Sequence, residues 1–251
     1  MLSEKPWKQD AVLLLLLRLF ICLGIGILAG ELLLPKMTGT TAGNLSFYRF
    51  LVSTLTVQGV AIILVHIFLR EHEWGWQRFL GLDAPPLGRV LFYAIVGAAC
   101  FLPVALALSK LSAMGIESVL HAEPDSQASV KVLRASQGLG QNICLAIATI
   151  LVAPFIEETM FRGILYPTVK QTGYPRLALI GTSVLFGAIH ANLMTFVPLT
   201  VFAMVLVWLY ERTDNLLTPI LAHSLFNAAN FILLMNEENI NSLWKSFSER
   251  I

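Results

Sequence analysis

Long apolar runs separated by short polar segments dominate the chain. A helix needs about 17–25 apolar residues to cross a hydrocarbon core roughly 30 Å thick. Seven runs meet or approach this length, and we expect one membrane-spanning helix in each: approximately residues 11–34, 48–69, 89–109, 141–161, 176–191, 193–210 and 215–235. The pattern predicts an all-α, polytopic membrane helix bundle with about seven transmembrane helices.

The polar segments between the runs are short, with one exception. Residues 70–88 are charged and rich in tryptophan, which is typical of an interfacial anchor. Residues 110–140 form the longest polar stretch; we expect a short surface helix there, with an eighth spanning helix as the alternative. The first run is too long for a signal-peptide core and should be retained. No repeat or linker divides the sequence, which predicts one integral membrane domain over residues 1–251.

Composition supports a bilayer as the solvent. Hydrophobic residues make up 56% of the chain and charged residues 13%, and the mean hydropathy is +0.72. A net charge of +1 gives no indication of a nucleic-acid partner. Cys22, Cys100 and Cys144 lie inside apolar runs without metal-ligand spacing. Lysine and arginine divide almost evenly between the two predicted sides, which favours a cytoplasmic N-terminus only slightly.

Ionisable residues at membrane depth are functional candidates, because each costs at least about 2.5–3.5 kcal/mol to insert. Arg18, Glu31 and His66 lie near the ends of their runs, where a structural role is expected. All four aspartates fall in predicted loops, which argues against an aspartyl protease: Asp10, Asp83, Asp125 and Asp214. The remaining candidates lie in the fourth, fifth and seventh runs: Glu157, Glu158, Arg162, His190, His223 and Asn227.

Helix counting brings these candidates to a similar depth. If the fourth helix continues to the turn at 171–175, Glu157 lies about 15 residues before it and His190 about 17 after it, or roughly 22–26 Å away. His223 and Asn227 follow the turn near 211–215 by about 10 and 14 residues, or roughly 15–21 Å. A shared depth requires the fourth helix to extend beyond Arg162.

Spacing within each helix suggests roles for the candidates. Glu158 and Arg162 are four residues apart and can pair, which lowers the cost of burying both. Glu157 points about 100° away on a helix and remains free to act as a general base. His223 and Asn227 are also four residues apart and could direct two donors toward an oxyanion.

Three motifs in order resemble a known family. "EETMFR" (157–162), "FGAIH" (186–190) and "HSLFN" (223–227) match the EExxxR, FxxxH and HxxxN/D motifs of the type II CAAX-protease and bacteriocin-processing family, also called the CPBP or Abi family. The resemblance covers roughly residues 141–235. It implies a metal-independent, glutamate-type intramembrane endopeptidase in a multi-helix bundle.

The resemblance also implies a role for each motif residue. Glu157 would activate a water molecule with His190 beside it, and His223 and Asn227 would stabilise the tetrahedral oxyanion. The other two motif residues would support the site: Glu158 and Arg162. Eukaryotic relatives cleave prenylated CAAX proteins, whereas bacterial relatives act in bacteriocin immunity or peptide maturation or have unknown substrates. We therefore expect a membrane-associated peptide or protein substrate, lipidated or not, and a bacterial-type cytoplasmic membrane location.

Other chemistries and functions remain open. Glu157, His190 and His223 could form a His₂Glu zinc set, although no HExxH motif is present, so we expect no cofactor without excluding zinc. Ser183 and His190 could form a serine protease pair, but no Gly-x-Ser-Gly elbow accompanies them. A transporter could use the buried Glu and His groups as a proton or ion relay, although no inverted repeat is evident. A non-catalytic immunity or scaffold protein is the last alternative.

Overall fold

A computed structural model describes residues 5–33, 42–82, 86–136, 138–239 and 242 of the chain. These residues contain helices and no strand, which confirms the predicted all-α class. The elements, in chain order, are α1 (Gln9–Leu33), α2 (Ala42–Glu71), α3 (Trp76–Leu80), α4 (Leu87–Gly115), η2 (Ile116–Leu120), α5 (Ala128–Arg134), α6 (Leu139–Ala146), η3 (Ile147–Val152), α7 (Ala153–Glu158), η4 (Thr159–Leu165), α8 (Tyr166–Gln171), α9 (Pro175–Ile189), α10 (Leu193–Thr213) and α11 (Leu217–Met235). The η segments are π-helical.

Six helical runs in the described residues are long and apolar enough to cross a membrane: Gln9–Gly26, Asn44–Glu71, Leu87–Val119, Leu139–Gln171, Leu193–Thr213 and Leu217–Met235. These correspond to six of the seven predicted spans. The fifth predicted span is α9, which has 15 residues and so a length of only about 22 Å. Its end is set by Ala191, whose φ of 47° is incompatible with a continuing right-handed helix.

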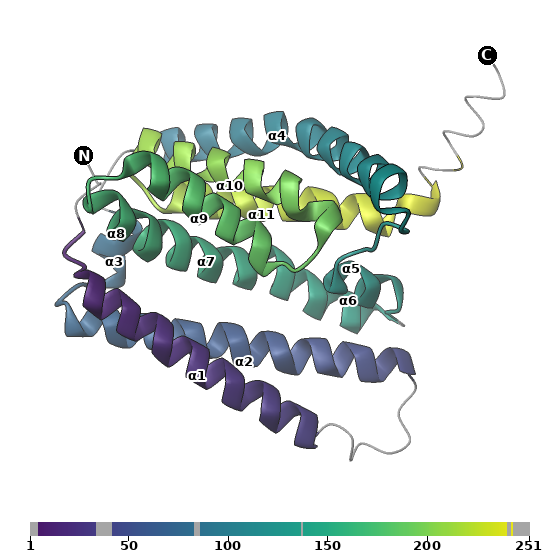
Figure 1. Cartoon of the computed structure of the whole chain (residues 1–251), viewed down its shortest axis with the longest axis horizontal. Helices are drawn as coiled ribbons and strands as arrows, with labels where there is room; N and C mark the ends of the chain where they lie inside the picture. Colours follow the sequence, from purple (N-terminus) through teal and green to yellow (C-terminus); the bar gives the residue numbers. More distant parts are fainter. Residues whose placement is uncertain (1–4, 34–41, 83–85, 137, 240–241, 243–251) are drawn as a thin grey trace.

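The run from α6 to α8 lies in the middle of the bundle (Figure 1). α1 and α2 pack against each other on one side of it, and α2 contacts α7. On the other side, α10 packs against α4 and α9, and α11 contacts α4, α7 and η3. Side chains on α7 are therefore enclosed by helices from both halves of the chain.

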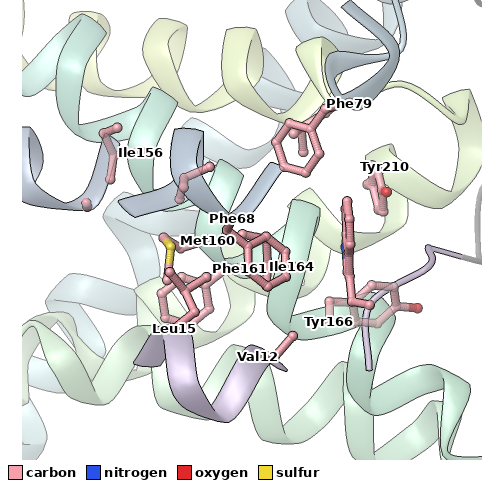
Figure 2. Packing of buried hydrophobic residues seen from close by; sticks show 14 of the residues in the cluster. Val12, Leu15, Phe68, Phe79, Ile156, Met160, Phe161, Ile164, Tyr166 and Tyr210 are labelled. Carbon is pink, nitrogen blue, oxygen red and sulfur yellow. The ribbon is translucent and has the colours of Figure 1, made fainter. Parts of the chain in front are cut away.

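A large apolar cluster holds the central run in place (Figure 2). Phe68 of α2, Phe79 of α3 and Ile164 of η4 are almost completely buried in it. The indole N–H of Trp7 donates to the carbonyl oxygen of Gly163 at 3.1 Å. Large apolar side chains such as Phe20 remain exposed on the outer surface, as expected for helices that face lipid. The N-terminal segment and the first two helices thus fix the outer side of the central run.

The polar stretch 110–140 contains the short helix α5, as predicted, after the π-helical end of the run that begins with α4. α5 has seven residues, too few to cross a membrane, and so does not form an eighth span. Its buried residues Val132 and Leu133 pack with Phe47 and Leu145. Arg134 at its end forms a partly exposed ion pair with Glu237 at 2.8 Å. α5 therefore connects α2 with the segment after α11.

The aspartate prediction was wrong in one position. Asp10 lies in the first turn of α1, not in a loop, because the helix begins at Gln9 and not at residue 11 as predicted. Asp125 and Asp214 lie outside the helices as predicted. Asp83 and the side chain of Glu31 lie outside the described residues.

Two polar side chains for which structural roles were predicted have partners in the fold. Arg18 of α1 lies 3.2 Å from the Glu71 carboxylate of α2. His66 accepts a hydrogen bond from the Trp76 indole at 3.1 Å. Both groups join neighbouring elements, in agreement with the structural roles predicted for them. The three cysteines are unpaired.

Candidate active site

The helical run that carries the two glutamates is continuous but irregular. It extends from Leu139 to Gln171, so the condition that the helix continue past Arg162 is met. The predicted turn follows directly, with Gly173 at φ 92° and Pro175 at the start of α9. α7 is flanked by the π-helical segments η3 and η4, an irregularity that occurs frequently at functional sites.

Glu158 and Arg162 form the predicted buried ion pair. Arg162 Nη1 donates to Glu158 Oε1 at 2.9 Å, and the side chains are 2% and 0% exposed. Arg162 Nη2 donates to the carbonyl oxygen of Ala203 on α10 at 2.9 Å. The guanidinium also lies 4.8 Å from the centre of the Phe186 ring on α9. The pair therefore joins the central run to both neighbouring helices.

The Glu158 carboxylate has a second partner that the sequence did not indicate. His223 Nδ1 lies 2.8 Å from the same oxygen, Oε1, and donates its proton to it. This bond fixes the ring so that Nε2 points toward Glu157, at 3.9 Å from Oε2. A histidine held by a carboxylate in this way presents one defined nitrogen to its surroundings.

Glu157 and Glu158 occupy different environments although they are adjacent. The Glu157 side chain is 21% exposed and lines a cavity of about 280 Å³. His190, His223 and Asn227 line the same cavity. The helix rise predicted that these four groups lie at a similar depth, and their shared cavity confirms that they come together. Their catalytic roles stay a prediction.

His190 immediately follows the last residue of α9. Its Nδ1 donates to the carbonyl oxygen of Phe186 at 2.8 Å, which leaves Nε2 as the other ring nitrogen. The Phe186 ring is centred 5.1 Å from His190 and 5.8 Å from His223. One buried aromatic ring therefore contacts both imidazoles.

Asn227 satisfies a backbone carbonyl that the π-helix leaves without a partner. The N–H of Ala153 donates to Ala148, and Pro154 has no N–H, so neither can serve the carbonyl of Thr149. Asn227 Nδ2 donates to that carbonyl at 2.8 Å instead. One amide hydrogen of Asn227 is thus used in the fold, and the second is the donor that remains for the cavity.

Other polar residues of the cavity were not singled out from the sequence. They are three carboxamides and three hydroxyl side chains: Gln58, Gln127, Asn230, Thr54, Ser129 and Thr149. A glutamine inside the apolar run 48–69 was the available signal for the first of them. Ser183 is buried and is not among the described residues that line the cavity. Within the described part of the chain, no group of three or more His, Cys, Asp or Glu side chains could hold a metal ion.

Comparison with known proteins agrees with these observations. Residues 139–229 match the family described as type II CAAX prenyl endopeptidase Rce1-like. A Bacillus subtilis (strain 168) protein named "Putative membrane peptidase YdiL" is 31% identical over 99 residues, which cover 39% of each chain. No solved structure matches the chain significantly. The chain is an integral, multi-pass membrane protein, and its residues 139–229 are similar to the Rce1-like type II CAAX prenyl endopeptidases.

Proposed function

We propose that the protein is an intramembrane endopeptidase in which Glu157 activates the attacking water. The observation that carries the proposal is the separation of two adjacent carboxylates. Glu158 is fully buried and bonded to Arg162 and His223, whereas Glu157 faces a cavity shared with both histidines. A carboxylate with access to water and without a tight ion pair suits a general base.

The proposed reaction begins when Glu157 takes a proton from water and the water oxygen attacks the scissile carbonyl carbon. His190 lies beside the same cavity and would help to position that water. The oxyanion would be stabilised by the remaining amide hydrogen of Asn227 and by His223 in its imidazolium form, in which Nε2 carries a second N–H while Nδ1 stays bonded to Glu158. The C–N bond then breaks, and Glu157 returns its proton to the leaving amine.

The substrate that fits this site is a membrane-associated peptide or protein. The cavity lies between helices that are surrounded by lipid-facing apolar surface, so a peptide must reach it from the bilayer or its interface. We propose that the substrate is lipidated or otherwise held at the membrane, and that the protein acts in a bacterial-type cytoplasmic membrane. In this proposal the protein needs neither a nucleic-acid partner nor a cofactor.

The test is cleavage by purified protein in lipid nanodiscs. A library of lipidated and unlipidated peptides is incubated with wild type, with Glu157→Gln and with wild type treated with a chelator. The Glu157→Gln variant keeps the side-chain volume and removes the base, so cleavage should fall by about 10²–10⁴-fold. Glu117→Gln removes an exposed carboxylate outside the cavity and serves as the matched control.

Each outcome distinguishes the alternatives. Cleavage that survives the chelator and is lost in Glu157→Gln supports the glutamate mechanism. Cleavage that is lost with the chelator and restored by zinc would instead make Glu157, His190 and His223 metal ligands. A wild type that cleaves none of the peptides contradicts the proposal and favours a relay or scaffold role.

A further inference from the structure

A peptide inside this bundle has to pair its main chain with side chains. In a membrane-spanning helix, the backbone N–H and C=O groups are used within the helix itself. The described residues contain no strand edge that could pair with an extended peptide. A peptide group that loses its water on binding and stays unpaired costs free energy. The polar side chains of the cavity must therefore supply these hydrogen bonds.

The cavity provides the chemistry for such pairing. No lysine or arginine is among the described residues that line it, so it is suited to neutral peptide groups rather than to a carboxylate. Four carboxamides line it, and three of them have partners within the protein. Gln127 Nε2 donates to the Thr195 hydroxyl at 3.0 Å. Asn227 donates to the backbone at 2.8 Å and Asn230 at 2.9 Å.

Gln58 is the fourth carboxamide, and it differs from the others. Its Oε1 is buried and has no hydrogen-bond partner among the described residues. Gln58 lies near the middle of α2, a helix of 30 residues with a long apolar span. A buried acceptor without a donor costs about 1–3 kcal/mol. Rotation of the carboxamide toward the cavity would let a bound peptide N–H recover this cost.

The location of Gln58 fits contact with a substrate. Phe50, Thr54 and Gln58 are spaced four residues apart on α2 and line the same cavity as Glu157. α2 packs against α7, which carries Glu157. A peptide lying along this side of the cavity would pass Gln58 while its scissile bond faces the general base.

We infer that Gln58 is a substrate-binding residue whose carboxamide pairs with one main-chain peptide group of the substrate, with Oε1 accepting its N–H. This inference rests on the proposed peptidase function. A carboxamide and a peptide group each carry one acceptor and at least one donor, so they can pair in both directions. The contact fixes the register of the peptide relative to Glu157.

The test is an N-methyl scan of a peptide that wild type cleaves. Each main-chain nitrogen is methylated in turn, and kcat/KM is measured for wild type and for Gln58→Met. At one position, methylation should lower wild-type kcat/KM about tenfold more than that of the variant, because only wild type has an acceptor to lose. Any steric effect of the methyl group is common to both proteins. Thr56→Val, on the same helix but facing Gly26 of α1, should keep the wild-type profile.

Stability provides the second readout. Gln58→Met removes an unpartnered amide and should melt at the wild-type temperature or above it. A lower melting temperature would show that Gln58 pairs within the protein, and would overturn the inference. An unchanged methylation profile in an active Gln58→Met would overturn it as well, while the proposed function stands. If wild type cleaves no peptide, the proposed function and this inference both fail.

Discussion

His223 Nδ1 lies 2.8 Å from Glu158 Oε1, the same oxygen that accepts from Arg162 at 2.9 Å. One buried carboxylate oxygen therefore joins a structural cation to an imidazole that lines the cavity. The bond also sets the orientation of the imidazole, because it occupies Nδ1 and leaves Nε2 to face Glu157. A histidine from a different helix thus lies between the second and the first glutamate of the EExxxR motif.

This relationship predicts that stability and activity can be separated at the ion pair. Arg162→Leu leaves Glu158 buried without its cation and should destabilise the protein by about 3–5 kcal/mol. Replacing both residues in Glu158→Leu/Arg162→Leu removes the unpaired charge and should restore most of that loss. Thermal unfolding in detergent measures both effects.

The same double variant should be inactive although its stability is restored. Without the Glu158 carboxylate, the His223 ring loses the hydrogen bond at Nδ1 that directs Nε2 toward Glu157. Cleavage of a peptide that wild type cuts is the measurement. A double variant that is stable and fully active would contradict the positioning role of Glu158. A single Arg162→Leu variant with wild-type stability would contradict the importance of the buried pair.

Asn227 should contribute to both fold and chemistry, and the two can be resolved. Asn227→Ala removes the proposed oxyanion donor and should lower kcat by about 10²–10³-fold. It also leaves the Thr149 carbonyl unpaired, at a cost of about 1–3 kcal/mol. Adding Pro154→Ala introduces a backbone N–H within reach of that carbonyl.

The double variant Asn227→Ala/Pro154→Ala should therefore regain stability without regaining activity. Thermal unfolding and kcat at saturating peptide are measured on the same preparations, with Pro154→Ala alone as the control. Recovery of both quantities would show that Asn227 serves only the backbone. Recovery of neither would contradict the role of Pro154 in leaving the Thr149 carbonyl without a backbone donor.

The depth of the candidate residues could be predicted from the sequence. The rise of a helix is fixed, so counting from the turn at 171–175 placed Glu157 and His190 at one level. Gly173 and Pro175 marked that turn, and the structure has it there. The pairing of Glu158 with Arg162 followed from their spacing of four residues.

The direction in which the residues face could not be predicted in the same way. Each π-helical turn includes an extra residue and rotates the following side chains, and the central run contains two such segments. No residue pattern in 147–152 or 159–165 marks them. The contact of His223 with Glu158 depends on how α11 packs against α7, which is a tertiary property. The early end of α9 likewise depends on the backbone at Ala191.

Gly187 should be essential for the position of His190. A Cβ atom at Gly187 would lie 2.8 Å from the carbonyl oxygen of Phe196 on α10, so an alanine must push the two helices apart. We expect Gly187→Ala to cost about 1–3 kcal/mol and to lower activity, because His190 lies three residues further on. Gly181→Ala is the control, since its Cβ would make an ordinary 3.7 Å contact with Leu177. Equal stability and activity in the two variants would contradict a close approach of α9 and α10.

Lys5 should make the stability of the protein depend on pH above neutrality. Its ammonium group is buried 4.9 Å from the centre of the Trp74 ring and 5.4 Å from that of Phe79. Burial lowers the pKa of Lys5 to about 8; Asp214 opposes this shift and Arg78 adds to it. Between pH 8 and the ordinary value of 10.5, the folded state binds fewer protons than the unfolded state. Stability should therefore rise with pH across that window.

Lys5→Met removes the buried charge and tests this sign. The variant should be more stable than wild type at pH 7, by at most about 3 kcal/mol, since one pKa unit corresponds to about 1.4 kcal/mol. The difference should shrink from about pH 8 upward and disappear above pH 10.5, where Lys5 is neutral in the unfolded state as well as in the folded state. Thermal unfolding at a series of pH values is the measurement, with Lys8→Met at an exposed position as the control. A difference that stays constant with pH would show that Lys5 keeps an ordinary pKa and that the variant acts through packing alone.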